Sequence, residues 1–259
     1  MRSTLVRRSV MTASAAALAL LATACGSSDS KDGAKADAPA SAAAPAASAA
    51  PAAKGKTDAE LASVIVKQAD LPEHVLKEAT PAEAAAGAAA TSDKPECLPL
   101  VKAQSQAPVG TATGAARTKA VAKPKEPAAG ASAEEKMKAA MDALGAPVTL
   151  VTVASYDGKG AEDAFAALKT AGTACAGGYA ATGGGDTGKI TKVAAGAPVT
   201  AGDAALAYTV EADADGEKIS TQLVVVRKGN TLATFSAVSL KGAAEQPKAV
   251  VDAQVKKLG

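Results

Sequence analysis

The stretch that decides the fold is Val148-Thr149-Leu150-Val151-Thr152-Val153-Ala154-Ser155-Tyr156. It is almost continuous in β-branched and other apolar residues, which is typical of a strand buried on both faces. A helix is predicted directly after it, from Gly160 to Ala176, because apolar and small residues recur there at helical spacing. Gly177-Gly178 ends that helix. This stretch therefore predicts a central strand with a helix packed against the sheet.

Beyond the helix, the chain alternates short apolar strands with turn residues. Asp215-Gly216 and Lys228-Gly229-Asn230 have the composition of hairpin turns. The predicted strands are Tyr179 to Thr182, Lys189 to Ala194, Ala204 to Glu211, Glu217 to Arg227 and Thr231 to Leu240. A last helix, Glu245 to Leu258, carries Val251, Val255 and Leu258 on one side. Strands joined by hairpins are antiparallel.

The part before the central strand is marked by helix-start signals. Thr57-Asp58-Ala59-Glu60 and Ser132-Ala133-Glu134-Glu135 are capping boxes, and Pro95 suits the first turn of a further helix. Short strands are predicted at Val75 to Ala79 and Thr111 to Ala122. We expect an Ala-rich connector at Pro81 to Ser92 and a Pro-rich loop at Lys123 to Gly130.

The helix opened by Ser132 has an apolar face, formed by Met137, Ala140, Met141 and Leu144. We interpret it as a surface helix lying on the sheet, and a partner-binding helix is the alternative. Together these elements predict an α+β domain over residues 57–259. We expect an antiparallel sheet of about five to seven strands, with three to five helices packed on it and one disulfide.

The N-terminus has the features of an export signal. Arg2, Arg7 and Arg8 precede an apolar run, Ala13 to Ala22, which is shorter than the roughly 20 residues that span a bilayer. Small residues Thr23 and Ala24 then precede Cys25. This pattern resembles the bacterial lipobox, whose cysteine becomes diacylated. It predicts removal of residues 1–24 and lipidation of Cys25.

The alternative is an ordinary secretory signal followed by an unmodified thiol. Whether export uses the Sec or the twin-arginine route stays open, because Arg7-Arg8 matches the latter in part. Residues 25–56 combine the lipidated cysteine with repeated Ala-Pro-Ala units and almost no large apolar side chain. Such a segment predicts a disordered tether. We therefore expect a protein held on the extracytoplasmic face of the membrane by a diacylglyceryl anchor.

Composition excludes several partners. Without residues 1–24 the chain has 25 basic and 26 acidic side chains, so it lacks the positive field that nucleic-acid binding needs. The sequence has no Trp, three Tyr and two Phe, which argues against stacking on bases or sugars.

If Cys25 is lipidated, Cys97 and Cys175 remain, and an even number of cysteines outside the cell predicts a disulfide. A metal or redox thiol site is the alternative.

Four patterns resemble functional motifs without completing them. Gly183 to Lys189 lacks the Ser or Thr that follows a P-loop lysine, and it leads into a strand. Glu211, Asp213, Asp215 and Gly216 mimic half of a calcium loop, but position twelve is Gln222. His74 is interpreted as an exposed lone histidine, and no G-x-S-x-G is present. A pair of carboxylates brought together by the fold stays open. We expect no cofactor and no metal.

A set of short motifs distributed along the predicted domain resembles one family. These are Ala69-Asp70-Leu71-Pro72, Pro95-Glu96-Cys97, Ala154-Ser155-Tyr156, Ala174-Cys175 and Gly202-Asp203-Ala204-Ala205. The chain looks like actinobacterial lipoproteins whose domain is similar to the extracellular sensor domain of PknH-type Ser/Thr protein kinases. The resemblance implies an antiparallel sheet with helices packed on it, a disulfide between helices and a ligand-binding cleft.

The expected function is a non-enzymatic binding or sensing domain for a small molecule or envelope component. Two alternatives remain: a structural or partner-docking lipoprotein acting through the Met137/Met141 face or a sheet edge, and an envelope hydrolase with a carboxylate pair. Ligand, partner and oligomeric state are not determined by the sequence.

Overall fold

The structure is a computed structural model that describes residues 53–124, 126–214, 216–239 and 243–259. These residues belong to one compact unit that spans Ala49–Gly259. The predicted signal peptide, Cys25 and most of the predicted tether lie outside the described residues. Among the described residues, no helix is both long and apolar enough to cross a bilayer.

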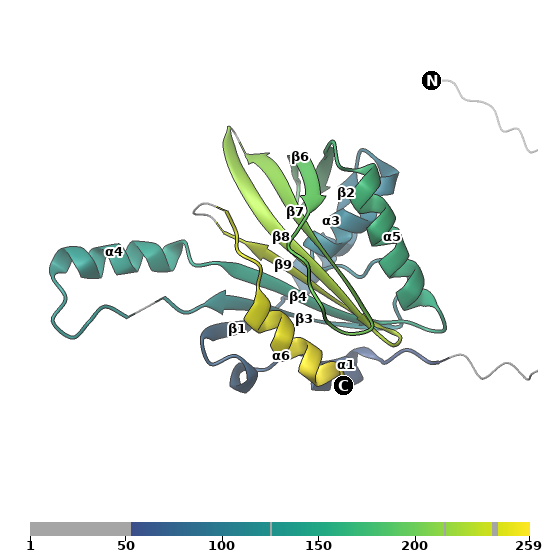
Figure 1. Cartoon of the computed structure of the whole chain (residues 1–259), viewed down its shortest axis with the longest axis horizontal. Helices are drawn as coiled ribbons and strands as arrows, with labels where there is room; N and C mark the ends of the chain where they lie inside the picture. The colour runs from purple at the N-terminus through teal and green to yellow at the C-terminus, as the bar shows by residue number, and fades with distance from the viewer. Residues whose placement is uncertain (1–52, 125, 215, 240–242) are drawn as a thin grey trace, which may run out of the picture. The chain divides into compact units, whose positions relative to one another are not determined.

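The body of the domain is one antiparallel sheet in the order β1-β3-β4-β9-β8-β7-β6-β5-β2 (Figure 1). The predicted central strand is β4, Val148–Ser155, and it pairs with β3, Gly114–Ala122, and β9, Thr231–Val238. The other strands are β1 (His74–Glu78), β2 (Thr91–Ser92), β5 (Tyr179–Gly183), β6 (Asp186–Ala195), β7 (Ala204–Ala214) and β8 (Glu217–Lys228).

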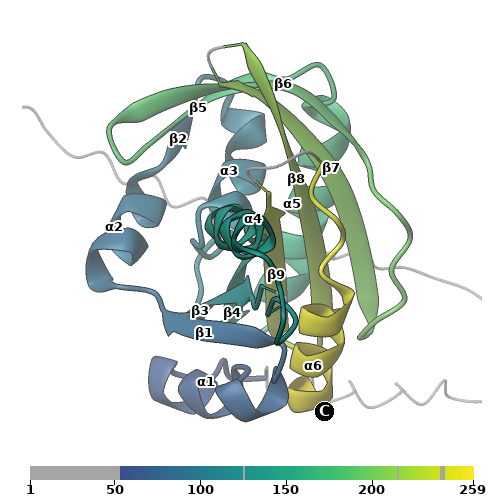
Figure 2. The ribbon, with the colours of Figure 1, turned by 90° about the vertical axis from the view of Figure 1, so that its left-hand side faces the viewer.

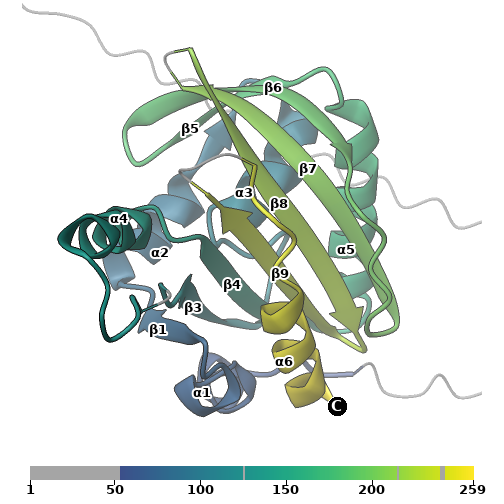
Figure 3. The ribbon, with the colours of Figure 1, turned by 60° about the vertical axis from the view of Figure 1, so that its left-hand side comes forward.

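Helices cover both faces of this sheet (Figure 3). One face packs against α3 (Leu98–Gln104) and α5 (Gly160–Ala174), and we call it the α3 face. The other packs against α1 (Asp58–Val64) and α6 (Lys248–Leu258), and we call it the α6 face (Figure 2). Because side chains alternate along a strand, each central strand contributes to both cores. Val151 and Phe235 lie in the α6-face core, and Ala154 and Leu232 lie in the α3-face core.

The predicted disulfide between Cys97 and Cys175 is present, with the two Cα atoms 5.8 Å apart. Cys97 ends a short 3-10 helix, η2 (Pro95–Cys97), and Cys175 caps the C-terminus of α5. Both are fully buried in the α3-face core. The bond therefore joins the two helical segments that cover the same face of the sheet.

The expected numbers of strands and helices were wrong. The described residues form nine strands in one sheet and six α-helices, and a further 3-10 helix, η1, spans Gln68–Asp70. The segment expected to be a connector contains α2, Pro81–Ala89, and the two-residue strand β2. Thr80 and Glu83 form a capping box at the start of α2. The sequence carried that signal, but the Ala-rich segment has no row of large apolar residues to reveal a helix by periodicity.

The helix opened by Ser132, α4 (Ala133–Leu144), does not lie on the sheet as expected. Figure 1 shows it projecting from the end of the sheet where β3 ends and β4 begins. None of its twelve residues is buried. The amphipathic pattern was identified correctly, but its apolar face is exposed to solvent.

The first described residues are fastened to the opposite end of β4. The Gly158 N–H donates to the Ala53 carbonyl over 2.8 Å, and the Asn230 side-chain amide donates to the Lys54 carbonyl over 2.7 Å. The Gly55 N–H donates to Asp157 Oδ1 over 2.7 Å. The chain therefore enters the domain at the end of the sheet remote from α4.

Candidate functional site

Strand pairing brings polar side chains of three strands together on the α3 face. In the registers of β3, β4 and β9, Arg117 lies opposite Thr152, and Thr152 lies opposite Thr234. Ser236 lies two residues further along β9, opposite Leu150. Residues directly opposite each other in an antiparallel sheet share a face. Thr152, Thr234 and Ser236 therefore form one group on the sheet, which we call the hydroxyl cluster.

The hydroxyl cluster is buried and unsatisfied. Thr152, Thr234 and Ser236 are 2%, 5% and 1% exposed. Their three side-chain oxygens have no hydrogen-bond partner among the described residues. Buried polar atoms in folded proteins are nearly always paired, and an unpaired hydroxyl costs about 1–3 kcal/mol. Three such groups side by side are the arrangement expected where a ligand or bound water completes the bonds.

The loop after α3 is bonded to β3 and β4 next to this group. Gln106, with φ 55°, ends the helix in a left-handed conformation and is 5% exposed. Its side-chain amide donates to the carbonyls of Thr118 and Val151, at 3.1 and 3.3 Å. Arg117 Nε donates to the Gln106 carbonyl over 2.6 Å. The loop is thus tied to both β3 and β4, which holds it in place over the sheet.

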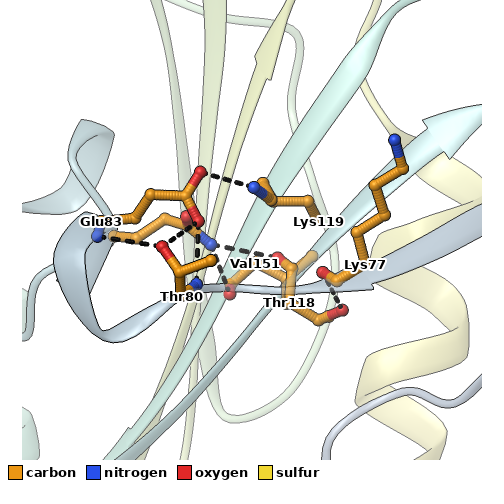
Figure 4. A network of polar contacts seen from close by, with 7 residues as sticks. Lys77, Thr80, Glu83, Thr118, Lys119 and Val151 are labelled. Carbon is orange, nitrogen blue, oxygen red and sulfur yellow. Dashed lines mark hydrogen bonds and ion pairs between the residues drawn. The ribbon is translucent and has the colours of Figure 1, made fainter.

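Lys119 of β3 places a cation on the same face, opposite Leu150. Lys119 follows Arg117 on β3 by two residues and forms a 2.5 Å ion pair with Glu83 of α2 (Figure 4). The Lys119 ammonium, together with the Thr80 N–H and hydroxyl, lowers the pKa of Glu83 to about 2. Glu83 therefore links the capped start of α2 to β3. It also holds the Lys119 ammonium beside the face that carries the hydroxyl cluster.

Next to the hydroxyl cluster, the α3 face is apolar and only half-buried. Val121, Val148, Val238 and Thr221 form one cross-strand row, and Leu150 lies in the row beside it. The four apolar residues of these two rows and Ile219 are half-buried. None of the five belongs to either of the two cores formed by the described residues. We call Val121, Val148, Leu150, Ile219 and Val238 the apolar strip.

The face therefore combines three kinds of surface: unsatisfied hydroxyls, a half-exposed apolar floor and a lysine. Ligand sites in proteins commonly pair apolar walls with a few polar groups that fix orientation. This arrangement would suit a small molecule with an apolar body and a hydrogen-bonding or anionic end. It supplies no nucleophile paired with a base.

The open hollows of the domain lie away from the hydroxyl cluster. One of about 590 Å³ lies between α1 and strands β1 and β3, and is lined by Asp58, Gln68 and Leu76 among others. Two of its polar side chains are already bonded to backbone: Asp58 Oδ1 accepts the Ala115 N–H, and Gln68 bonds the backbone at Leu71, His74 and Leu76. For this reason we place the candidate site at the hydroxyl cluster instead.

His74 is half-buried at the start of β1 instead of exposed as expected. Burial lowers its pKa, and its buried Nδ1 has no hydrogen-bond partner among the described residues. It lies in a hollow of about 380 Å³ beside Asp70 and Asp252. Asp70 is bonded to the Lys67 N–H and to Lys257, and these contacts lower its pKa. A carboxylate held ionised in this way is not a proton donor at neutral pH.

The same holds for the other carboxyls with shifted pKa values in the described part of the chain. Those of Glu60, Glu83, Glu135 and Asp203 are all lowered, each by a backbone or side-chain hydrogen bond. A general acid in a carboxylate pair needs a raised pKa. These carboxylates act as helix caps and ion-pair partners, which are structural roles.

The motif-like segments lie in hairpin turns. Gly183 to Lys189 comprises the last residue of β5, the two-residue turn Gly184-Gly185 and the start of β6. The acidic tip between β7 and β8 is closed by a bond from the Gly216 N–H to Asp213 Oδ1, and Asp215 lies outside the described residues. Among the described residues, no group of three or more His, Cys, Asp or Glu is placed to bind a metal ion.

The hydroxyl cluster and Gln106 were missed in the sequence. The sequence predicts Val148 to Tyr156 as a buried, nearly continuous β-branched strand, and Thr and Val have the same β-branched shape, so Thr152 does not stand out. The signal was there: Thr152 falls in phase with Leu150 and Ala154, on one face of the strand. That a second and a third hydroxyl lie beside it depends on β9 pairing with β4, which sequence order does not reveal.

No protein-family model and no curated protein sequence matches the chain. Among solved structures, it is similar to the crystal structure of the extracellular domain of PknH from Mycobacterium tuberculosis. The two share 14% identity at a TM-score of 0.45, over 79% of this chain and 97% of that one. That domain is of the kind that the short motifs of the sequence resemble. A likeness of this degree carries no information about ligand or activity.

Proposed function

We propose that this protein is a lipid-anchored, non-enzymatic binding protein of the extracytoplasmic face, with its ligand on the α3 face of the sheet. The arginines, apolar run and small residues before Cys25 support export and lipidation. The disulfide supports an oxidising compartment. Two acyl chains on Cys25 would give stable membrane attachment where one chain is marginal.

The observation that carries the binding function is the hydroxyl cluster. Its three buried side-chain oxygens have no partner in the described chain, so their hydrogen-bonding capacity is unused. They lie on the same face as the apolar strip and the Lys119–Glu83 ion pair. The ligand class that fits is a small amphipathic molecule. Its polar or anionic end would meet the hydroxyls and lysine, and its apolar body would cover the strip. Envelope components such as fatty acids have this chemistry.

The experiment is a thermal-shift screen of the mature chain with fatty acids, lysophospholipids and cell-wall fragments. A ligand at 100 times its Kd adds about 2.7 kcal/mol to the free energy of unfolding. Ser236→Ala and Thr234→Val should leave the melting temperature of the free protein unchanged or raise it, because the hydroxyls they remove are unpaired. The same variants should abolish the ligand-induced shift.

Thr209→Val is the matched control. Thr209 lies on the α6 face, and its hydroxyl bonds Gln222 at 3.1–3.2 Å. This variant should lower stability slightly and keep the ligand shift. If no compound in the screen shifts the wild type, or if Ser236→Ala binds as well as wild type, the site is wrong.

The anchor has a separate test. Mass spectrometry of the native protein should find residues 1–24 removed and a diacylglyceryl group on Cys25. Cys25→Ala should leave the leader attached and abolish the lipid modification. An unmodified thiol at position 25 in the processed protein would exclude the anchor and leave the ordinary secretory signal.

A second candidate is a partner-docking lipoprotein, which the exposed apolar face of α4 favours. Met137, Met141 and Leu144 are 65%, 58% and 82% exposed. Deleting residues 133–144 would then abolish capture of the partner and leave the thermal-shift response to small molecules intact. The two candidates are therefore separable by one deletion.

A further inference from the structure

Helix α4 exposes an apolar face that water does not favour. Of the four large apolar side chains exposed in the described part of the chain, three are on this helix: Met137, Met141 and Leu144. Their spacing of four and three residues places them on one side of a helix. We call these three residues the α4 stripe.

The stripe faces away from the chain segment that α4 already contacts. A trough of about 460 Å³ separates α4 from the Pro-rich segment before it, and the helix lines that trough with Glu135, Lys138, Ala139 and Asp142. These positions lie on the side of the helix opposite Met137. The charged side of α4 therefore meets its own connecting segment, and the stripe points outward.

The apolar strip of the sheet begins where α4 is attached. Val121 is the penultimate residue of β3, and Val148 is the first residue of β4. Only residues 145–147 separate the end of α4 from β4. Two incompletely covered apolar surfaces, one on the helix and one on the sheet, are thus joined by a connector of three residues.

We propose that α4 is a lid that closes over the α3 face, so that its stripe packs against the apolar strip and encloses the ligand. This inference rests on the proposed binding function and adds Met137, Met141 and Leu144 to the residues that contact the ligand. Methionine side chains are flexible and polarisable, and they adapt to irregular partners. The structure holds the lid in its open position.

The sheet of the same chain is a better occupant for the stripe than a membrane or a second copy. Helix α4 has three acidic and two basic side chains, whereas helices that lie on anionic membranes are basic. The chain also enters the domain at the end of β4 remote from α4. A second copy would pay the translational entropy of association, which a three-residue connector removes.

Cross-linking of the full mature chain tests the lid. The test variant is Met141→Cys with Thr221→Cys, since Thr221 lies in the row of Val148 and Val238 on the α3 face. The control is Met141→Cys with Gln222→Cys, the adjacent residue on the same strand, which faces the α6 side. Both strand positions are half-buried, and the native disulfide pair leaves neither Cys97 nor Cys175 free.

A short bis-maleimide should link positions 141 and 221 within one monomer, on the order of tenfold more than 141 and 222. Peptide mapping identifies the linked residues. A covalent dimer linked through 141 would show that a second copy covers the stripe, and absence of the 141–221 link would show that α4 stays open. Either result overturns the lid. Leu144→Cys with Ile219→Cys repeats the test at a second pair.

The lid and the proposed binding function are tested by different measurements, so one can be overturned while the other stands. Cross-linking needs no ligand, so it reports closure even if no compound binds. A ligand shift that persists with residues 133–144 deleted, at unchanged Kd, would keep the binding site and remove the lid from it. A Kd weakened on the order of tenfold by that deletion is the result expected for a lid that contacts the ligand.

Discussion

At the scale of single residues, hydrogen-bonding capacity distinguishes structural from functional polar groups. The buried Gln254 of α6 uses its side chain fully: its oxygen accepts the Val66 N–H, and its amide donates to the Val64 carbonyl, each over 2.9 Å. The hydroxyls of Thr152, Thr234 and Ser236 are as deeply buried and make no such bond within the described chain. The first kind of group holds two helical segments together, and the second kind has hydrogen-bonding capacity left for the proposed ligand.

Gln254→Met should therefore destabilise the fold. The change keeps most of the side-chain volume. It leaves two backbone groups at the C-terminal end of α1, the Val64 carbonyl and the Val66 N–H, without their partner. Each unsatisfied buried group costs about 1–3 kcal/mol, so urea unfolding should show a loss of about 2–4 kcal/mol. Gln246→Met is the control, since Gln246 is half-buried and donates a single bond to the Ala197 carbonyl. Equal losses in both variants would contradict the assignment.

Glu83 gives a prediction about pH. Its folded-state pKa, about 2, lies below the ordinary value of 4.5, mainly because Lys119 bonds the carboxylate. A carboxyl whose pKa is lowered by folding stabilises the folded state at every pH above its ordinary pKa. That stabilisation is lost as the pH falls from about 4.5 towards 2. Glu83→Gln should thus lower the melting temperature at pH 7 and shrink the drop between pH 5 and pH 2.5. The control is Glu217→Gln at the β7–β8 hairpin, which removes the same charge. It should leave the drop in melting temperature between pH 5 and pH 2.5 as large as in the wild type.

At the scale of elements, α5 and α4 differ in how closely they pack: α5 is packed tightly against the sheet, whereas α4 has no such packing. Gly172 of α5 lies against the ring of Tyr208 on β7, whose hydroxyl points to the carbonyls of Leu168 and Lys169 at 3.4 Å. Helix α5 buries five residues, and α4 buries none. Helices with few buried contacts open at low free-energy cost. This difference makes α5 part of the scaffold and α4 the element suited to move.

Gly172→Ala should destabilise the protein although alanine is the better helix former. The added methyl group would overlap the Tyr208 ring, and overpacking of this kind costs about 1–3 kcal/mol. The helical preference of alanine returns at most about 1 kcal/mol. Gly177→Ala is the control, because its methyl group would meet no atom within 4 Å. A melting temperature unchanged in Gly172→Ala would show that α5 can shift away from β7.

At the scale of the whole molecule, one covalent bond closes a long loop. Cys97 and Cys175 are 78 residues apart and join two segments on the α3 face. Closing such a loop stabilises the folded state by about 4–5 kcal/mol in the chain-entropy model. The bond also fixes the start of α3, and the loop after this helix is bonded to β3 and β4 next to the hydroxyl cluster. The disulfide thus contributes to stability and to the shape of the candidate site.

Cys97→Ser with Cys175→Ser should lower the free energy of unfolding by about 3–5 kcal/mol, measured in urea. Stability should fall by a comparable amount when the wild type is reduced. The thermal-shift response to a ligand should weaken as well, since the loop bonded to β3 and β4 next to the hydroxyl cluster loosens. A loss below about 1 kcal/mol would mean that packing alone holds α3 and α5 together.

Several features of this protein follow from the sequence by itself. The hairpin order of β6 to β9, the buried central strand and the helix before Gly177-Gly178 are local patterns, so neighbouring residues suffice to predict them. The pairing of Cys97 with Cys175 followed from counting, given the interpretation of Cys25 as lipidated. The leader, the tether and the anchor stay predictions, since they lie in or adjoin residues outside the described part.

The tertiary structure alone decided which strands are neighbours and what each amphipathic face meets. Strand β9 lies beside β4 although 75 residues separate Ser155 from Thr231, and that pairing collects Thr152, Thr234 and Ser236. The pattern of α4 predicted an apolar face, but whether the sheet covers that face depends on long-range packing. Periodicity is a local property of the chain, whereas strand order and burial depend on contacts between distant residues, and for this reason the candidate site appeared only in three dimensions.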